Sequence, residues 1–260
     1  MNLEDLRQPT KAALRIAAEL AFRRLELPAA RGELAPENLS QSGRRHLLRL
    51  VESYGLKIAS LSVDVPGLRL TDPRTADERI ARTCAALELA ADLKVPVVTA
   101  SVEALTDSKS GDPSAAAIEA LRKIGENADG RGVRYALRPT VDSHDHVGRL
   151  LKALACPALG VGLDPGALVM HGVNPLGRIE QVAGHVALLH ARDATAGSPD
   201  VPGLEARLTE GDVDFVGLLG VLEAADYAGP FIVRRWQSAM PMEELQDARR
   251  RMQELLERED

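Results

Sequence analysis

The sequence has few cysteines, few aromatic residues and no long apolar run, and each shortage excludes a class of protein. The 260 residues include only two cysteines, Cys84 and Cys156, and neither has a partner at a metal-type or redox-type spacing. No stretch approaches the roughly 20 apolar residues of a membrane-spanning helix. The start, MNLEDLRQPTKAALRIAAEL, lacks the apolar segment of a signal peptide. These shortages predict a cytoplasmic protein that does not bind a membrane.

The chain also has no excess of positive charge. The formal net charge is −6, and no long Lys/Arg run occurs, so the basic surface typical of a nucleic-acid-binding protein is absent. Apolar residues make up 45% of the chain and charged residues 27%, which is an ordinary globular balance. No linker-like shift in composition divides the chain. We therefore predict one domain over residues 1–260.

Short β-rich runs alternate with amphipathic helical patterns, which is typical of βα units around a parallel sheet. Strands are predicted at 23–27, 57–63, 96–102, 133–138, 159–164, 186–190 and 230–235. Helices are predicted at 11–22, 38–54, 74–93, 113–129, 144–154, 175–183, 213–225 and 242–257. Asp142 or Ser143 is expected to cap the fifth helix rather than to bind a metal. The fold predicted from this pattern is an α/β (β/α)8 TIM barrel.

One strand is missing from that count, and it belongs before the first helix. The first strand is therefore predicted to be short or truncated. We expect Asn2 to Leu6 to fill the gap, because an open barrel would leave unpaired backbone groups at its edge. A second chain that covers the edge, or a misassigned start codon, would also account for the missing strand.

Polar residues at the carboxyl ends of the predicted strands converge on one mouth in such a barrel. These residues are Glu26, Asp64, Glu103, Arg138, Asp164, His190 and Arg234. Convergence of so many polar side chains favours a binding site. Asp193, three residues after His190, is expected to orient the imidazole through its second nitrogen.

Three stretches carry a family resemblance. VGLDPGALVMHGVNPLGRI, GHVALLHARDA and LTEGDVDFVGLLGVLEAADYAGPFIVRR resemble the second half of the sugar phosphate isomerase/epimerase family, within the wider group of xylose isomerase-like barrels. The first half resembles the family more loosely, through AAELAFRRLEL and LLRLVESYGLKIASLSV. The resemblance implies a barrel that acts on a sugar or a sugar phosphate. Homo-oligomer formation is compatible with it.

In that family, Glu, Asp, His and Glu at the tips of strands five to eight hold a divalent cation. Asp164 in GLDPG and His190 in LLHARDA match the Asp and His positions, whereas Arg138 in YALRP and Arg234 in FIVRRW stand at the two Glu positions. Such oxygen and imidazole ligands suit Mn²⁺, Mg²⁺, Co²⁺ or Zn²⁺. Two unit charges about 4 Å apart interact by roughly 4 kcal/mol at an effective dielectric near 20, so the arginines should repel a cation. We expect no cofactor, and a divalent metal only if the altered site still binds one.

Several hypotheses follow for the two arginines. They pair with Asp164 and nearby acids, which keeps the structure and loses the activity, or they form an anion site for a phosphate or carboxylate of a sugar-derived ligand. A displaced metal or a misaligned strand would also account for the two exchanges. Ala167 is a further departure, since relatives often hold His or Asn there.

The candidate site residues follow from these arguments. The catalytic candidates are His190, Asp164 and Glu26, and the substrate-binding candidates are Arg138, Arg234, Asp193 and Asp64. The first functional hypothesis is a sugar or sugar-phosphate isomerase/epimerase with altered or lost metal-dependent activity. The second is a non-catalytic barrel that binds an anionic metabolite or serves as the partner of an active relative. Whether the chain is an enzyme stays open, and a third hypothesis, a DNA-cleaving barrel, is disfavoured by the acidic charge.

Overall fold

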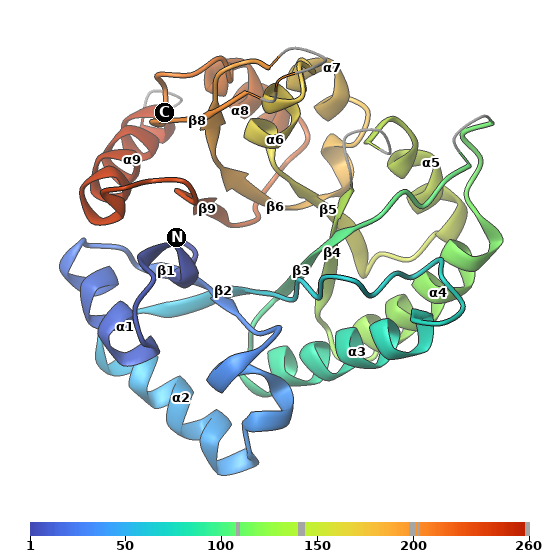
Figure 1. Ribbon diagram of the computed structural model, residues 1–260, viewed down its shortest axis with the longest axis horizontal. Coiled ribbons are helices and arrows are strands. Elements are labelled where there is room, and N and C mark those ends of the chain that lie inside the picture. The colour runs from blue at the N-terminus through green and yellow to red at the C-terminus, as the bar shows by residue number, and fades with distance from the viewer. Residues whose placement is uncertain (108–109, 140–143, 198–200, 202, 258–260) are drawn as a thin grey trace.

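In the computed structural model, seven parallel strands pair in the order β1-β2-β3-β4-β5-β6-β9. They curve into a nearly closed barrel with helices on the outside (Figure 1). The strands are β1 (Arg24–Pro28), β2 (Lys57–Ser62), β3 (Val97–Val102), β4 (Arg134–Pro139), β5 (Leu159–Leu163), β6 (Val186–Ala191) and β9 (Phe231–Val233). The structure describes residues 1–107, 110–139, 144–197, 201 and 203–257. The TIM-barrel prediction is confirmed, with seven strands in place of eight.

The helices follow the strands as the alternating pattern predicts. They are α1 (Thr10–Glu19), α2 (Gln41–Ser53), α3 (Ala76–Asp92), α4 (Ala115–Asp129), α5 (His144–Leu154), α6 (Pro165–Met170), α7 (Pro175–Ile179), α8 (Phe215–Ala224) and α9 (Pro241–Leu256). Side-chain caps fix several helix starts: Ser40, Ser114 and Asp214 each accept a hydrogen bond from the backbone N–H three residues later. The expected cap of α5, Asp142 or Ser143, lies outside the described residues.

The seam between β1 and β9 holds only a trace of the first strand. Asn2 forms a single parallel bridge with Glu26, so the prediction of a short first strand is confirmed. A strand over Asn2 to Leu6 is wrong, because Leu3–Leu6 forms a 3-10 helix. The cause is local: the Asn2 side chain accepts the N–H of Glu4 at 2.8 Å and so caps the 3-10 helix that starts at the next residue.

The main core lies between the strands and the outer helices. On α3, for example, Thr83, Ala86, Leu87 and Ala90 are buried at helical spacing. A second, smaller cluster fills the inside of the barrel and consists of Ala59, Val97, Ala136, Ala187, Leu188 and Ile232. Three of its members, Ala59, Val97 and Ala187, also line a cavity at the end of the barrel where the strands start.

The sequence did not predict two features of the fold. Helix α6 starts directly after β5, and a short antiparallel hairpin joins β7 (Asp193–Ala194) to β8 (Glu205–Ala206). Both lie at the end of the barrel where the strands finish. Both cysteines are free. Among the residues that the structure describes, no helix has the length and apolar character needed to span a bilayer.

Candidate functional site

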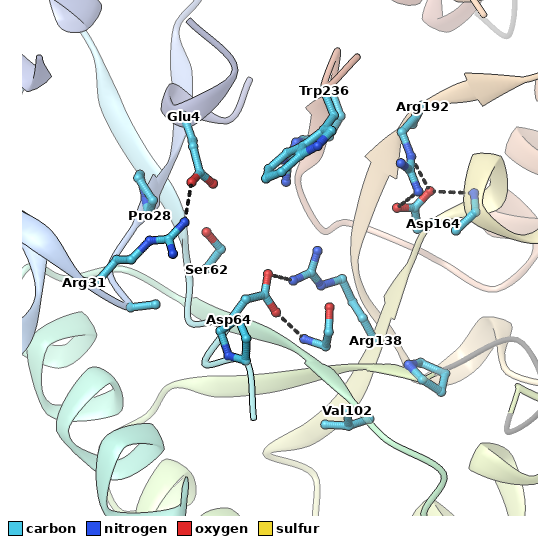
Figure 2. Close-up of a pocket in the computed structure, with 16 residues that line it drawn as sticks. Glu4, Pro28, Arg31, Ser62, Asp64, Val102, Arg138, Asp164, Arg192 and Trp236 are labelled. Atoms are coloured by element: carbon cyan, nitrogen blue, oxygen red, sulfur yellow. Dashed lines mark hydrogen bonds and ion pairs between the residues drawn. The ribbon is translucent and has the colours of Figure 1, made fainter. Parts of the chain in front are cut away.

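A cavity of about 640 Å³ opens at the carboxyl ends of the strands (Figure 2). Four arginines and three carboxylates line it: Arg31, Arg138, Arg192, Arg234, Glu4, Asp64 and Asp164. The predicted mouth is therefore a real cavity, and the strand-tip residues Asp64, Arg138, Asp164 and Arg234 all reach it. The charged groups are arranged as pairs, which decides what the site can bind.

Arg138 pairs with Asp64 across two strands. The Arg138 guanidinium on β4 donates a hydrogen bond to one oxygen of Asp64, and the other oxygen accepts the N–H of Ser101 at 2.6 Å (Figure 2). Although burial opposes ionisation, the Arg138 charge holds the pKa of Asp64 below its usual range. The Asp64 carboxylate is thus a stable anion and the fixed partner of Arg138.

Arg234 pairs with a carboxylate that the sequence did not indicate. Its Nε and Nη2 atoms each donate to one oxygen of Asp5 at 3.0 Å, and its Nη1 lies 3.5 Å from Oε1 of Glu26. The Asp5 and Glu26 side chains are fully buried, and that of Arg234 is 10% exposed. Such a two-bond contact with little water is the strong form of an ion pair.

Glu26 and His190 bond to each other inside the barrel. His190 Nε2 lies 2.9 Å from Oε1 of Glu26, which also accepts from Asn2 Nδ2 at 2.6 Å, while Oε2 accepts from Ser60 Oγ at 2.9 Å. Burial lowers the pKa of His190, although Glu26 favours its protonation. The pKa of Glu26 is held well below its usual range despite burial, through His190 and Arg234. His190 Nδ1 is buried and has no hydrogen-bond partner in the described chain.

Asp164 is bonded by Arg192. The Nε and Nη2 atoms of Arg192 lie 3.0 and 2.8 Å from the two Asp164 oxygens. The same carboxylate accepts the N–H of Ala167 at 3.0 Å and caps α6, and its pKa is lowered, against the effect of burial, chiefly by Arg192. The hypothesis that Arg138 and Arg234 pair with Asp164 is therefore wrong, because Asp164 caps α6 and contacts Arg192. The two arginines pair with other nearby acids.

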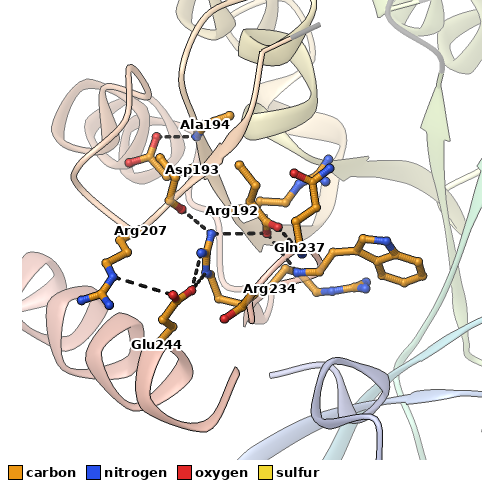
Figure 3. Close-up of polar contacts among 12 residues, drawn as sticks. Arg192, Asp193, Ala194, Arg207, Arg234, Gln237 and Glu244 are labelled. Carbon is orange, nitrogen blue, oxygen red and sulfur yellow. Dashed lines mark hydrogen bonds and ion pairs between the residues drawn. The ribbon is translucent and has the colours of Figure 1, made fainter. Parts of the chain in front are cut away.

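Asp193 does not orient His190, so that prediction is wrong; Glu26 is the hydrogen-bond partner of the imidazole. The Asp193 carboxylate accepts the backbone N–H groups of Ala194, Gly211 and Val213 at 2.8, 2.9 and 3.2 Å. Figure 3 shows its bond to Ala194. It joins the hairpin to the loop before α8 and does not line the cavity.

Glu103 also turns away from the mouth, since its carboxylate accepts the N–H and hydroxyl of Thr71 at 2.9 and 3.1 Å. A strand tip fixes where a Cα lies but not where a long side chain turns. Glu103 therefore stabilises a neighbouring loop.

Trp236 lines the cavity and was missed by the sequence argument. It is 51% exposed, and the Arg234 guanidinium carbon lies 5.6 Å from its ring centroid. Its backbone is fixed by Arg7, which donates to its carbonyl at 2.6 Å, and by Glu205, which accepts its N–H at 3.0 Å. The sequence could have indicated Trp236 as a cavity residue, because it is the sole tryptophan of the chain and comes two residues after Arg234.

Arg235, unlike Arg234, does not line the cavity and contacts α9 and β8 instead. It bonds Glu244 of α9 through Nε at 2.7 Å and the Ala206 carbonyl at 2.6 Å. Arg207 also reaches Glu244, as Figure 3 shows. Arg235 thus fastens α9 and β8 beneath the segment that carries Trp236.

The donor set does not fit the divalent cation implied by the resemblance. Asp64 and Asp164 each hold a guanidinium, while Glu26 and His190 hold each other. Among the described residues, no group of three or more His, Cys, Asp or Glu side chains is placed to hold a metal ion. A divalent cation would therefore have to displace a guanidinium or imidazole partner that each of these side chains already has.

Comparisons with known proteins agree with this fold. A family model described as xylose isomerase-like TIM barrel matches residues 14–256. A xylose isomerase domain protein from Planctomyces limnophilus has a TM-score of 0.81 at 19% identity. The match covers 93% of this chain and 90% of the Planctomyces chain. A xylose isomerase-like TIM barrel protein from Mycobacterium smegmatis, in complex with magnesium, has a TM-score of 0.77 at 20% identity. The match covers 95% of this chain and 87% of the Mycobacterium chain.

A D-tagatose 3-epimerase-like protein has a TM-score of 0.76 at 18% identity, covering 98% of each chain. Other structural neighbours are a mannonate dehydratase from Streptococcus suis and an IOLI protein with a bound zinc atom. No curated protein matches the sequence. The structural neighbours thus span isomerase, epimerase and dehydratase names, and some bind metals.

Proposed function

Since the chain belongs to the xylose isomerase-like TIM barrel family, we propose that it binds a sugar-derived small molecule at the mouth of the barrel without a divalent cation. The observation that carries this proposal is the pairing of Asp64, Asp164 and Asp5 with Arg138, Arg192 and Arg234. Each carboxylate already has a resident cation. The ligand therefore meets a set of fixed donors and acceptors.

The composition of the cavity supports a polyhydroxylated ligand. Its volume of about 640 Å³ lies within the roughly 300–1,000 Å³ of small-molecule pockets. Paired guanidinium and carboxylate groups offer both donors and acceptors to hydroxyl groups, and the Trp236 ring offers an apolar face. Guanidinium groups also suit a sugar acid or a sugar phosphate, because they recognise carboxylate and phosphate oxygens through paired N–H donors.

The same geometry argues against the family's metal-dependent proton transfer. Glu26 and His190 are fully buried and bond each other, so neither presents a free base to a ligand. Asp64 and Asp164 have lowered pKa values, which makes them weak bases at neutral pH. We assign Arg138, Arg234 and Asp64 to ligand binding, Asp164 to holding Arg192, and Glu26 with His190 to the support beneath.

The test uses the fluorescence of Trp236, the single tryptophan of the chain, titrated with mannonate, a hexose phosphate and a neutral hexose in the presence of EDTA. We expect saturable binding of an acidic sugar. Arg138→Gln should weaken it about tenfold or more, since a hydrogen bond to a charged group contributes roughly 1.5–3 kcal/mol. Arg45→Gln, an exposed position on α2, is the matched control. Binding that requires Mn²⁺, or equal binding by the Arg138 variant, would refute the proposal.

A further inference from the structure

A second cavity, of about 680 Å³, lies at the opposite end of the barrel. The first residues of several strands line it, including Arg24 of β1, Lys57 of β2 and Arg134 of β4, together with the turn at 225–230 before β9. Parallel strands all start at this end, so this cavity is separated from the mouth by the filled inside of the barrel. Nothing in the proposed function uses it.

The charges here are not balanced, in contrast to the mouth. Three cations, Arg24, Lys57 and Arg134, line the cavity with one acid, Asp226. Within the described part of the chain, none of the three cations has a carboxylate within ion-pair distance. At the mouth, by comparison, every lining guanidinium has a carboxylate partner.

Arg134 is the most constrained of the three, because it points into the barrel. Its Nε atom is buried without a hydrogen-bond partner, and its Nη atoms reach only the carbonyls of Val186 and His185, at the long distances of 3.5 and 3.4 Å. Burial lowers the pKa of Arg134. A partly desolvated guanidinium without a counter-charge is unfavourable, and a bound anion would remove that cost.

The surroundings keep Arg134 open on the cavity side. A Cβ at Gly160 would lie 2.8 Å from an Arg134 Nη atom, so glycine at this position leaves the guanidinium its space. Ala59 and Ala187 line the same cavity with small side chains. The Tyr227 hydroxyl donates to the Pro230 carbonyl at 2.8 Å and is therefore engaged within the turn. Small apolar side chains thus lie beside a basic group in this cavity.

We propose that this cavity is a second binding site, for the oxyanion group, phosphate or carboxylate, of a small organic ligand with an apolar body. The three cations would neutralise the anion, with Arg134 as the deepest contact. The alanine, proline and valine walls would contact the body. The site is independent of the proposed sugar site, because it lies at the other end of the barrel and uses none of its residues.

The experiment follows the side-chain Nε–H signal of Arg134 by ¹⁵N NMR, assigned from its loss in Arg134→Met. The probes are inorganic phosphate, phenyl phosphate and phenol. Phenyl phosphate should shift the signal saturably and about tenfold more tightly than inorganic phosphate, since burial of roughly 55 Å² of apolar surface corresponds to that factor. Phenol should not shift it. Equal affinity for the two phosphates would refute the claim that the ligand has an apolar body. No shift with either phosphate would refute the claim that the cavity binds an oxyanion.

The variants separate the site from general salt effects. Arg24→Gln/Lys57→Gln changes exposed side chains, so it should fold, and it should weaken phenyl phosphate binding at least tenfold. Arg122→Gln, an exposed position on α4, should bind as the wild type. An equal loss in both variants would refute the site. The Trp236 fluorescence titration run in parallel reports the mouth alone, so failure of either proposal is seen separately.

Discussion

The buried pair of Arg234 and Asp5 gives the sharpest stability prediction. Replacing Arg234 with Met leaves the Asp5 carboxylate, fully buried, and Glu26 without their guanidinium. Removing one partner of a buried pair costs about 3–5 kcal/mol. Arg207 serves as the control, because it is 41% exposed and lies 3.7–3.8 Å from its carboxylates. Arg207→Met should cost only about 0–1 kcal/mol.

Urea unfolding monitored by circular dichroism measures both variants. The expected result is a lower midpoint for Arg234→Met with an unchanged slope, which identifies a loss of stability rather than a change in the folded state. Adding Asp5→Asn should recover part of the loss, with a coupling of roughly 0.5–3 kcal/mol. If Arg234→Met cost no more than Arg207→Met, the pair would have no structural role and our account of the mouth would be wrong.

Three further predictions follow from the site. After incubation with Mn²⁺, Co²⁺, Zn²⁺ and Mg²⁺ and desalting, mass spectrometry should find no stoichiometric metal, whereas one equivalent lost on His190→Ala would refute the charge argument. Because burial lowers the folded pKa of His190, its contribution to stability is complete above the unfolded value of about 6.5 and is lost as the pH falls through the folded pKa. His190→Gln should therefore flatten the pH dependence of the urea midpoint below about pH 6.5, and an unchanged slope would contradict this. Gly162→Ala should lower the free energy of unfolding by about 1–3 kcal/mol and weaken ligand binding, since the added Cβ would lie 2.7 Å from Cγ of Arg138. Unaltered stability and binding would show that Arg138 moves freely.

The sequence was sufficient for most of the fold. Hydrophobic alternation placed each of the seven strands to within about two residues, because buried strands and amphipathic helices follow periods that the sequence displays directly. It missed helix α6, which is short and whose apolar residues resemble a continuation of the strand before it. It also misjudged Asn2 to Leu6, where a side-chain cap overrode the tendency to complete the barrel.

The candidate site was predicted in part of its members, since Asp5, Arg192 and Trp236 were missed, and its pairings were not predicted. The tips at Arg138 and Arg234 follow from strand ends, and their pairing with nearby acids follows from charge. Their partners depend on three-dimensional packing: Asp5 and Arg234 are 229 residues apart, and nothing local in either segment indicates the other. Asp193 failed for a related reason, since the hairpin brings three backbone N–H donors to its carboxylate and leaves no bond to His190.

In the proposed function, guanidinium groups stand where the resemblance places a bound ion, and this would change how the barrel depends on its surroundings. A cation carried on a side chain cannot dissociate, be removed by a chelator or be displaced by a competing ion. The proposed mouth would therefore be complete as soon as the chain has folded, with a charge arrangement independent of the metal supply. On the same proposal the mouth would lack a Lewis acid, because a guanidinium donates hydrogen bonds but has no vacant orbital with which to polarise a carbonyl group.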